Sequence, residues 1–180
     1  MTNAMAQGIT NLERQFEIRF ALPSDASSLA KFAAEQFRTT YSTDTPESDL
    51  EAYISENFTP VKQCEEIESH RSRVVLAISR EDIIGYSHVE LDEGDTRSAF
   101  LNRIYVDPAW KGKSVGSALL AEVIANVRQQ GKDRISLTVY EKNTRAVAFY
   151  KKSGFDVIGT DIFQVGDDKQ TDFVMEKRLV

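Results

Sequence analysis

The strongest constraint on the fold is a strand that stops at a proline and leads through a short loop into a long amphipathic helix. Residues 101–108 indicate a strand ended by Pro108, and 109–116 form a loop of small and basic residues. From Ser114 onward, apolar residues recur at helical spacing as far as Gly131, a favoured C-terminal cap. A helix start presents unpaired N–H groups and partial positive charge, which favour a phosphate. The pattern therefore predicts a strand, loop and helix unit that binds phosphate.

The loop differs from two better-known nucleotide-binding loops. Gly112 and Gly116 permit close backbone approach, and Lys111 and Lys113 add positive charge. A nucleoside-triphosphate loop would need glycine where this chain has Asp107, and the three-glycine dinucleotide pattern is absent as well. This spacing favours a pyrophosphate held by backbone groups.

The rest of the chain alternates strand and helix patterns without an internal repeat or a linker. One domain is expected over 16–180, preceded by a flexible tail at 1–15. The expected strands are 16–20, 74–79, 83–91, 99–106, 134–140, 155–163 and 171–179. The expected helices are 26–40, 46–58, a short one after Pro60, 114–131 and 144–153.

Composition limits the partners of the chain. Lys and Arg number 22 against 28 Asp and Glu, which gives a formal net charge of −6. That charge disfavours nucleic acid and anionic membranes and suits a small cationic substrate. The single cysteine, Cys64, allows neither an intrachain disulfide nor a cysteine-based zinc cluster, which fits a reducing compartment. No run approaches the roughly 20 apolar residues of a membrane span. We therefore expect a soluble cytoplasmic protein without a metal.

A second segment, 139–155, places two polar residues on one face of a helix. Asn143 is a natural N-cap, and Tyr150 follows seven residues later. At about 100° per residue, seven residues span roughly 700°, so both side chains project from nearly the same face. One ligand could contact both.

Together the two segments resemble the GNAT superfamily of acetyltransferases. Lys111, Ser114 and Gly116 occupy the places of its acyl-CoA signature, in which Gln or Arg is followed by Gly and then by Gly or Ala. Residues 139–155 are similar to the family's strand, asparagine, helix, tyrosine and Gly-Phe segment without a gap. Lysine replaces Gln or Arg, and Ser114 replaces the first glycine, so a positive φ at 114 would carry strain.

The resemblance implies an α/β fold, more strictly α+β, with a mixed, mostly antiparallel twisted sheet flanked by helices. The sheet would be splayed between the strands that end at Val106 and Tyr140 to admit acetyl-CoA as co-substrate. Backbone groups of Ile104 and Val106 would pair with the pantetheine arm, and Asn143 would contact that arm or a water. Tyr150 would protonate the leaving thiolate. The residues implied to hold the phosphates are Lys111, Gly112, Lys113, Ser114, Val115, Gly116 and Ser117.

The implied activity is direct transfer of an acetyl group from acetyl-CoA to a primary amine in a ternary complex. Segment 37–50 is similar to polyamine-type members, which favours a small cationic amine. A protein or peptide amine, an antibiotic amine and a non-catalytic acyl-CoA sensor are the alternatives. Dimers are common in the superfamily, so the resemblance also allows a homodimer.

The general base and several nearby side chains have two interpretations each. Relatives carry a glutamate at positions that correspond here to Phe100 and Thr138, neither of which is a base. His88 and Glu90 alternate on the strand 83–91 and are the candidates, although a lone histidine is more often structural. Trp110 covers either the core or an adenine. The carboxylates that either attract a polyamine or form a solvated face are Asp44, Glu47, Glu65, Glu66 and Glu68.

Overall fold

The structure is a computed structural model that describes residues 15–91 and 97–179. Nearly all of the expected tail, residues 1–14, lies outside the described residues. The strands are β1 (Glu17–Phe20), β2 (Ser72–Ser79), β3 (Asp82–Leu91), β4 (Ser98–Val106), β5 (Arg134–Tyr140), β6 (Asp156–Val165) and β7 (Asp168–Arg178). The helices are α1 (Ala26–Tyr41), α2 (Glu47–Asn57), α3 (Pro60–Glu68), α4 (Val115–Gln129) and α5 (Thr144–Lys152), with short 3-10 turns at Pro23–Asp25 and Pro108–Trp110. Every helix and strand expected from the sequence is present.

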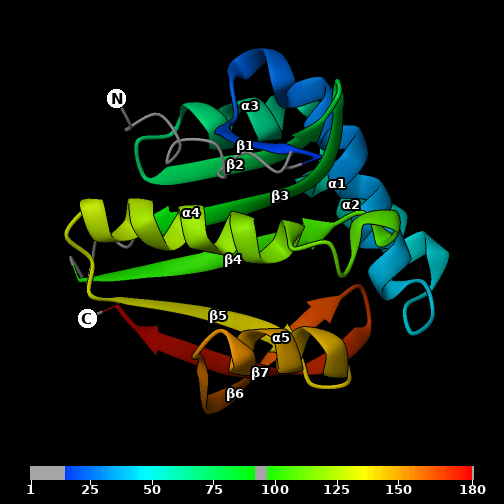
Figure 1. The fold of residues 1–180 in the computed structure, drawn as a ribbon. Coiled ribbons are helices and arrows are strands. Elements are labelled where there is room, and N and C mark those ends of the chain that lie inside the picture. Colours follow the sequence, from blue (N-terminus) through cyan, green and yellow to red (C-terminus); the bar gives the residue numbers. More distant parts are fainter. Residues whose placement is uncertain (1–14, 92–96, 180) are drawn as a thin grey trace, which may run out of the picture.

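The strands form one sheet in the order β1-β2-β3-β4-β5-β7-β6. All neighbouring strands are antiparallel except β4 and β5, which are parallel. Within the described residues, β4 and β5 pair only where Ser98–Phe100 lies opposite Arg134–Ser136. Figure 1 shows the two strands starting together and then diverging toward α5. The mixed, mostly antiparallel and splayed sheet is confirmed.

A bulge in β4 determines which side chains border the splayed region. His88 lies opposite Arg103, and Val89 opposite Leu101, so Asn102 is the extra residue. Leu101 packs in the core beneath α4, whereas Tyr105 packs on the opposite side of the sheet. Without the bulge these two residues would share a face, because side chains alternate along a strand. The bulge therefore reverses the side of the sheet that each side chain faces along the end of β4, just before the gap.

Two apolar cores lie on opposite faces of the sheet. Helices α4 and α5 cover one face and α1, α2 and α3 cover the other (Figure 1). The predicted apolar stripe of α4 is buried, from Val115 through Leu119 to Val127. Gly85 on β3 allows close contact with this helix, because a Cβ there would lie 3.0 Å from the Tyr105 carbonyl oxygen and 3.2 Å from Val115 Cγ1. The start of α4 is thus held firmly against the end of β4.

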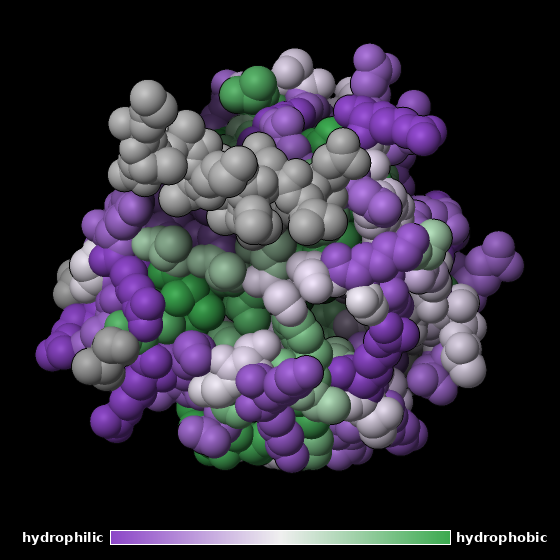
Figure 2. Space-filling view, viewed as in Figure 1, coloured by the Kyte–Doolittle hydropathy of each residue, from purple (hydrophilic) through white to green (hydrophobic). Residues whose placement is uncertain are grey.

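The outer surface is largely polar. Figure 2 shows hydrophilic side chains over much of one face, with apolar atoms at the lower edge, where β6 ends the sheet. Val157, Ile158 and Ile162 of β6 are exposed. Among the described residues, no helix has the length and apolar character required to span a membrane.

Candidate functional site

The loop before α4 has the geometry of an anion-binding site. Gly112 has a φ of 84°, and Ser114, the N-cap of α4, has a φ of 65° with ψ of 7°. The Ser114 side chain makes no capping hydrogen bond, while its carbonyl accepts from Ala118 N at 3.0 Å. The preceding N–H groups of the first turn have no partner within the helix and can bind an anion. Ser114 thus adopts the positive φ that carries strain for a residue with a Cβ.

Replacing Ser114 with glycine is expected to raise the free energy of unfolding by up to about 1 kcal/mol. A left-handed conformation costs an L-residue about 1–2 kcal/mol, and the greater freedom of glycine in the unfolded chain offsets part of the gain. Urea unfolding followed by circular dichroism measures the change. Ser117→Gly, inside the first turn of α4, is the matched control and should lower stability by about 0.5 kcal/mol. A loss of stability in Ser114→Gly would contradict the assigned strain.

The helix α5 presents the second predicted pair of residues. Asn143 caps the helix, because its Oδ1 accepts from Ala146 N at 3.2 Å. Tyr150 is only 7% exposed and lies edge-on to Phe149 and Phe155, with ring centroids 5.2 and 5.6 Å away. Burial, and secondarily the nearby Tyr105, raises the pKa of the Tyr150 hydroxyl above its ordinary value of 10. The hydroxyl is therefore a proton donor at neutral pH.

A cleft of about 770 Å³ joins the loop, the gap and α5. Trp110 also lines it and is packed edge-on against Phe16 with centroids 6.3 Å apart. Lys113, by contrast, is not among the lining residues; its ammonium lies 4.9 Å from the Trp110 ring centroid. The residues named from the sequence that line the cleft are Ile104, Val106, Lys111, Gly112, Ser114, Val115, Gly116, Ser117, Asn143 and Tyr150.

Three basic side chains in the cleft were not identified from the sequence. Lys142, Arg145 and Lys152 line it together with Lys111. The sequence contains a signal for them, because all three lie in or next to the segment from Asn143 to Tyr150. Basic residues on a short helix, however, usually indicate only a solvent-exposed face. Four cations in the cleft that contains the start of α4 suit a ligand with several phosphate groups.

The other end of the cleft lies at the C-terminus of α1. Gln36, Thr39, Thr40, Thr43 and Asp44 line this end. Tyr105 from β4 and Tyr140 from β5 line the cleft between the two ends. The cleft thus passes from a basic region beside α4 and α5 to a polar region with a carboxylate beside α1.

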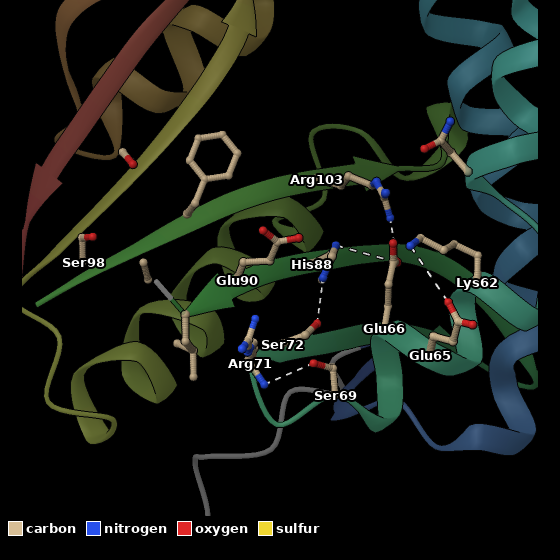
Figure 3. A pocket seen from close by; sticks show the side chains of 15 residues that line it. Lys62, Glu65, Glu66, Ser69, Arg71, Ser72, His88, Glu90, Ser98 and Arg103 are labelled. Carbon is tan, nitrogen blue, oxygen red and sulfur yellow. Dashed lines mark hydrogen bonds and ion pairs between the residues drawn. The ribbon is translucent and has the colours of Figure 1, made fainter. Parts of the chain in front are cut away.

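The two candidate bases lie elsewhere. His88 and Glu90 line a second cavity of about 930 Å³, bordered by α3 and the strands β2, β3 and β4, as Figure 3 shows. Asn102 Nδ2 donates to Glu90 Oε1 at 2.6 Å. Burial first, and then the positive charges of Arg103 and Lys62, lower the pKa of His88 to about 3. An imidazole with that pKa is neutral at pH 7 but is a weak proton acceptor, so His88 is poorly suited to deprotonate an ammonium group.

His88 belongs to a buried polar network. Its Nε2 lies 2.7 Å from Ser72 Oγ, and its Nδ1 lies 3.8 Å from Glu66 Oε2. The same Glu66 oxygen accepts from Arg103 Nη1 at 2.8 Å (Figure 3). Glu66 therefore connects α3 to β4 at the level of the bulge.

His88 is expected to make the protein less stable in mild acid. Below about pH 6.5 the unfolded chain binds a proton at this residue, whereas the folded chain, in which the pKa is about 3, does not. The free energy of unfolding should therefore fall by roughly 1 kcal/mol per pH unit between pH 6 and 4 from this group. Urea unfolding of wild type and His88→Gln at several pH values measures it, and the variant should show the shallower dependence. The exposed His70→Gln serves as control, and equal slopes in all three proteins would contradict the assignment.

Comparisons with known proteins agree with this geometry. The model of the Acetyltransferase (GNAT) family matches residues 31–155. An uncharacterised N-acetyltransferase of Mycobacterium tuberculosis is 31% identical over 157 residues, which cover 87% of this chain and 99% of that protein. A spermidine N(1)-acetyltransferase of Thermoplasma acidophilum is 28% identical over 166 residues, 90% of this chain and 96% of that protein.

A solved structure shows the same fold with a ligand. The crystal structure of the PaiA N-acetyltransferase from Thermoplasma acidophilum in complex with coenzyme A has a TM-score of 0.79 and 28% sequence identity to this chain. The similarity covers 91% of this chain and 98% of that one.

Proposed function

The chain belongs to the GNAT family of acetyltransferases, and on that premise we propose that it moves an acetyl group from acetyl-CoA to a small cationic primary amine in a ternary complex. Acetyl-CoA-dependent N-acetyl transfer is the activity of the enzyme class. The observation that carries the proposal is the single cleft that contains both the anion-binding loop and Tyr150.

The chain's own residues fit acetyl-CoA. The N–H groups at the start of α4, together with Lys111 and Arg145, suit its phosphates. Past Phe100 the edge of β4 that faces β5 is unpaired within the described residues, which leaves backbone groups of Ile104 and Val106 for the amides of the pantetheine arm. An arm in that position would lie as an added strand in the gap of the sheet.

The proposed chemistry uses few protein groups. Acetyl-CoA supplies an activated thioester, and no cysteine of the chain lines the cleft, so the amine attacks directly. The backbone N–H of Val106 polarises the acetyl carbonyl in this proposal. Asn143 fixes the start of α5, and Tyr150, held by Phe149 and Phe155, donates its proton to the departing sulfur.

Two features support a small cationic acceptor. Asp44 provides an exposed carboxylate at the α1 end of the cleft, away from the basic residues beside α5. The relative from Thermoplasma acidophilum is named a spermidine N-acetyltransferase. A diamine or polyamine would place one amine at the gap and a second positive charge near this rim.

An amine panel tests the proposal. The protein is incubated with acetyl-CoA and spermidine, spermine, free lysine, a peptide with a free N-terminus or an aminoglycoside, and CoA release is measured. The highest kcat/KM is expected for a polyamine. A better peptide substrate would assign peptide acetylation instead. CoA binding in a thermal-shift assay without turnover of any amine would assign an acyl-CoA sensor.

A further inference from the structure

A buried carboxylate lies next to a residue of the cleft wall. Asp172 of β7 is 6% exposed and lies directly opposite Tyr140 of β5, a residue that lines the cleft. Opposed residues of antiparallel strands project on the same side of the sheet. Asp172 therefore projects on the side of the sheet away from α4, next to Tyr140; Asp172 itself is not among the residues that line the cleft.

Polar partners satisfy the Asp172 carboxylate only in part. The Thr138 hydroxyl donates a hydrogen bond to it, while Asp172 Oδ1 is buried and has no hydrogen-bond partner among the described residues. An unpaired buried carboxylate oxygen is costly, and natural proteins retain such groups mainly where a ligand or a reaction uses them. The free oxygen lies in a residue adjacent to Tyr140, so a donor that reaches past Tyr140 from the cleft would find an acceptor there.

The charged and titratable groups around Asp172 come from three elements. Asp161 of β6 is its partner across the strand pair, and Tyr41 of α1 and Tyr105 of β4 are close enough for its charge to raise the pKa of each hydroxyl, after the larger effect of burial. Burial first, and the charge of Asp161 second, raises the pKa of Asp172 to about 6. No cation is among the groups that shift the pKa of Asp172.

Tyr105 connects this carboxylate to the proposed acid. Its side chain lines the cleft and shares a hydrogen bond with Tyr41. It is also near enough to Tyr150 to raise the pKa of that hydroxyl. Asp172 and Tyr150 therefore lie on opposite faces of the sheet, and Tyr105 is near both.

We infer that Asp172 binds the primary ammonium group of the acceptor and accepts its proton before attack, as the general base opposite Tyr150. The inference rests on the proposed acetyl transfer. The freed nitrogen lone pair forms the C–N bond as the C–S bond breaks, and the thiolate takes the Tyr150 proton. The acceptor loses two protons in total: the first passes from Asp172 to solvent, and the second replaces the one that Tyr150 gives up.

The acidity of Asp172 suits this role. An alkylammonium has a pKa near about 10, so an ordinary carboxylate near about 4 removes its proton very rarely. A carboxylate with a pKa of about 6 is about 100-fold more effective, yet it is still ionised at pH 7 and attracts the cation. The same group can therefore bind the acceptor and deprotonate it.

Asp172→Asn is the direct test. The change keeps the side-chain shape and removes a buried charge, so the fold and the Kd for CoA should be unchanged. kcat/KM for the amine is expected to fall about 100-fold. Asp156→Asn, which removes an exposed carboxylate at the start of β6, is the matched control and should stay within about twofold of wild type. A fall of less than about threefold in Asp172→Asn would overturn the inference.

The pH profile provides a readout that needs no disruptive variant. In wild type, kcat/KM should decrease as the pH falls below about 6, because protonated Asp172 can neither attract the ammonium nor take its proton. Asp161→Asn should move this acid limb to lower pH, since Asp161 helps to raise the pKa of Asp172. If the acid limb survives unchanged in Asp172→Asn, the inference about Asp172 is overturned and the proposed function is not. A wild type that binds CoA but acetylates no amine would overturn both this inference and the proposed function.

Discussion

Tyr150→Phe is expected to lower kcat about 100-fold while the KM for acetyl-CoA changes by less than about twofold. The substitution removes one hydroxyl and keeps the ring that packs against Phe149 and Phe155. General acids contribute about 10²–10⁴-fold to a rate, and a thiolate is a fair leaving group without assistance, so the lower end of that range applies. Steady-state CoA release with the best amine of the panel measures both constants.

Tyr86→Phe is the matched control for this prediction. Tyr86 is fully buried in the other core and does not line the cleft. Removing its hydroxyl should leave kcat within about twofold. If Tyr150→Phe retained more than half of the wild-type kcat, another group would have to protonate the sulfur.

The order of elements could be predicted because local patterns in this chain agree with the fold. Helix α4 has an uninterrupted apolar stripe, and β5 alternates buried and half-buried residues along its length. The loop end of the cleft follows from local sequence, because the loop is contiguous with α4, and Asn143 and Tyr150 belong to one helix and its N-cap. Contiguous sequence determines that half of the site.

The acceptor side could not be predicted, because long-range pairing creates it. In the stretch 99–106 both alternating sets of residues contain apolar side chains, so nothing in the pattern indicates that Asn102 bulges and turns Tyr105 toward α1. Asp172 stands in an alternating polar strand, where a carboxylate normally indicates a solvent-exposed face. Only the pairing of β7 with β5 places it next to Tyr140, which lines the cleft. His88 is unsuited to act as a base for a similar reason, because the strand pattern alone does not show that this side chain is buried.

Phe155→Ala is expected to lower the free energy of unfolding by about 4 kcal/mol. Phe155 is 1% exposed, follows Gly154 at the end of α5, and its N–H donates to the Tyr150 carbonyl at 3.0 Å. The lost ring leaves a cavity beneath Tyr150, and the backbone turn at Gly154, with a φ of 87°, leaves α5 little freedom to fill it. Urea unfolding measures the loss.

Phe155→Leu tests whether the volume of this side chain or its aromatic ring is what matters. Leucine fills most of the cavity, so this variant should lose only about 1 kcal/mol. Because the Phe155 ring is one of two that fix Tyr150, kcat should fall in Phe155→Ala even at a temperature where the variant is fully folded, and should recover in large part in Phe155→Leu. Equal kcat in wild type and folded Phe155→Ala would show that the Gly154-Phe155 turn stabilises the sheet without positioning the Tyr150 hydroxyl.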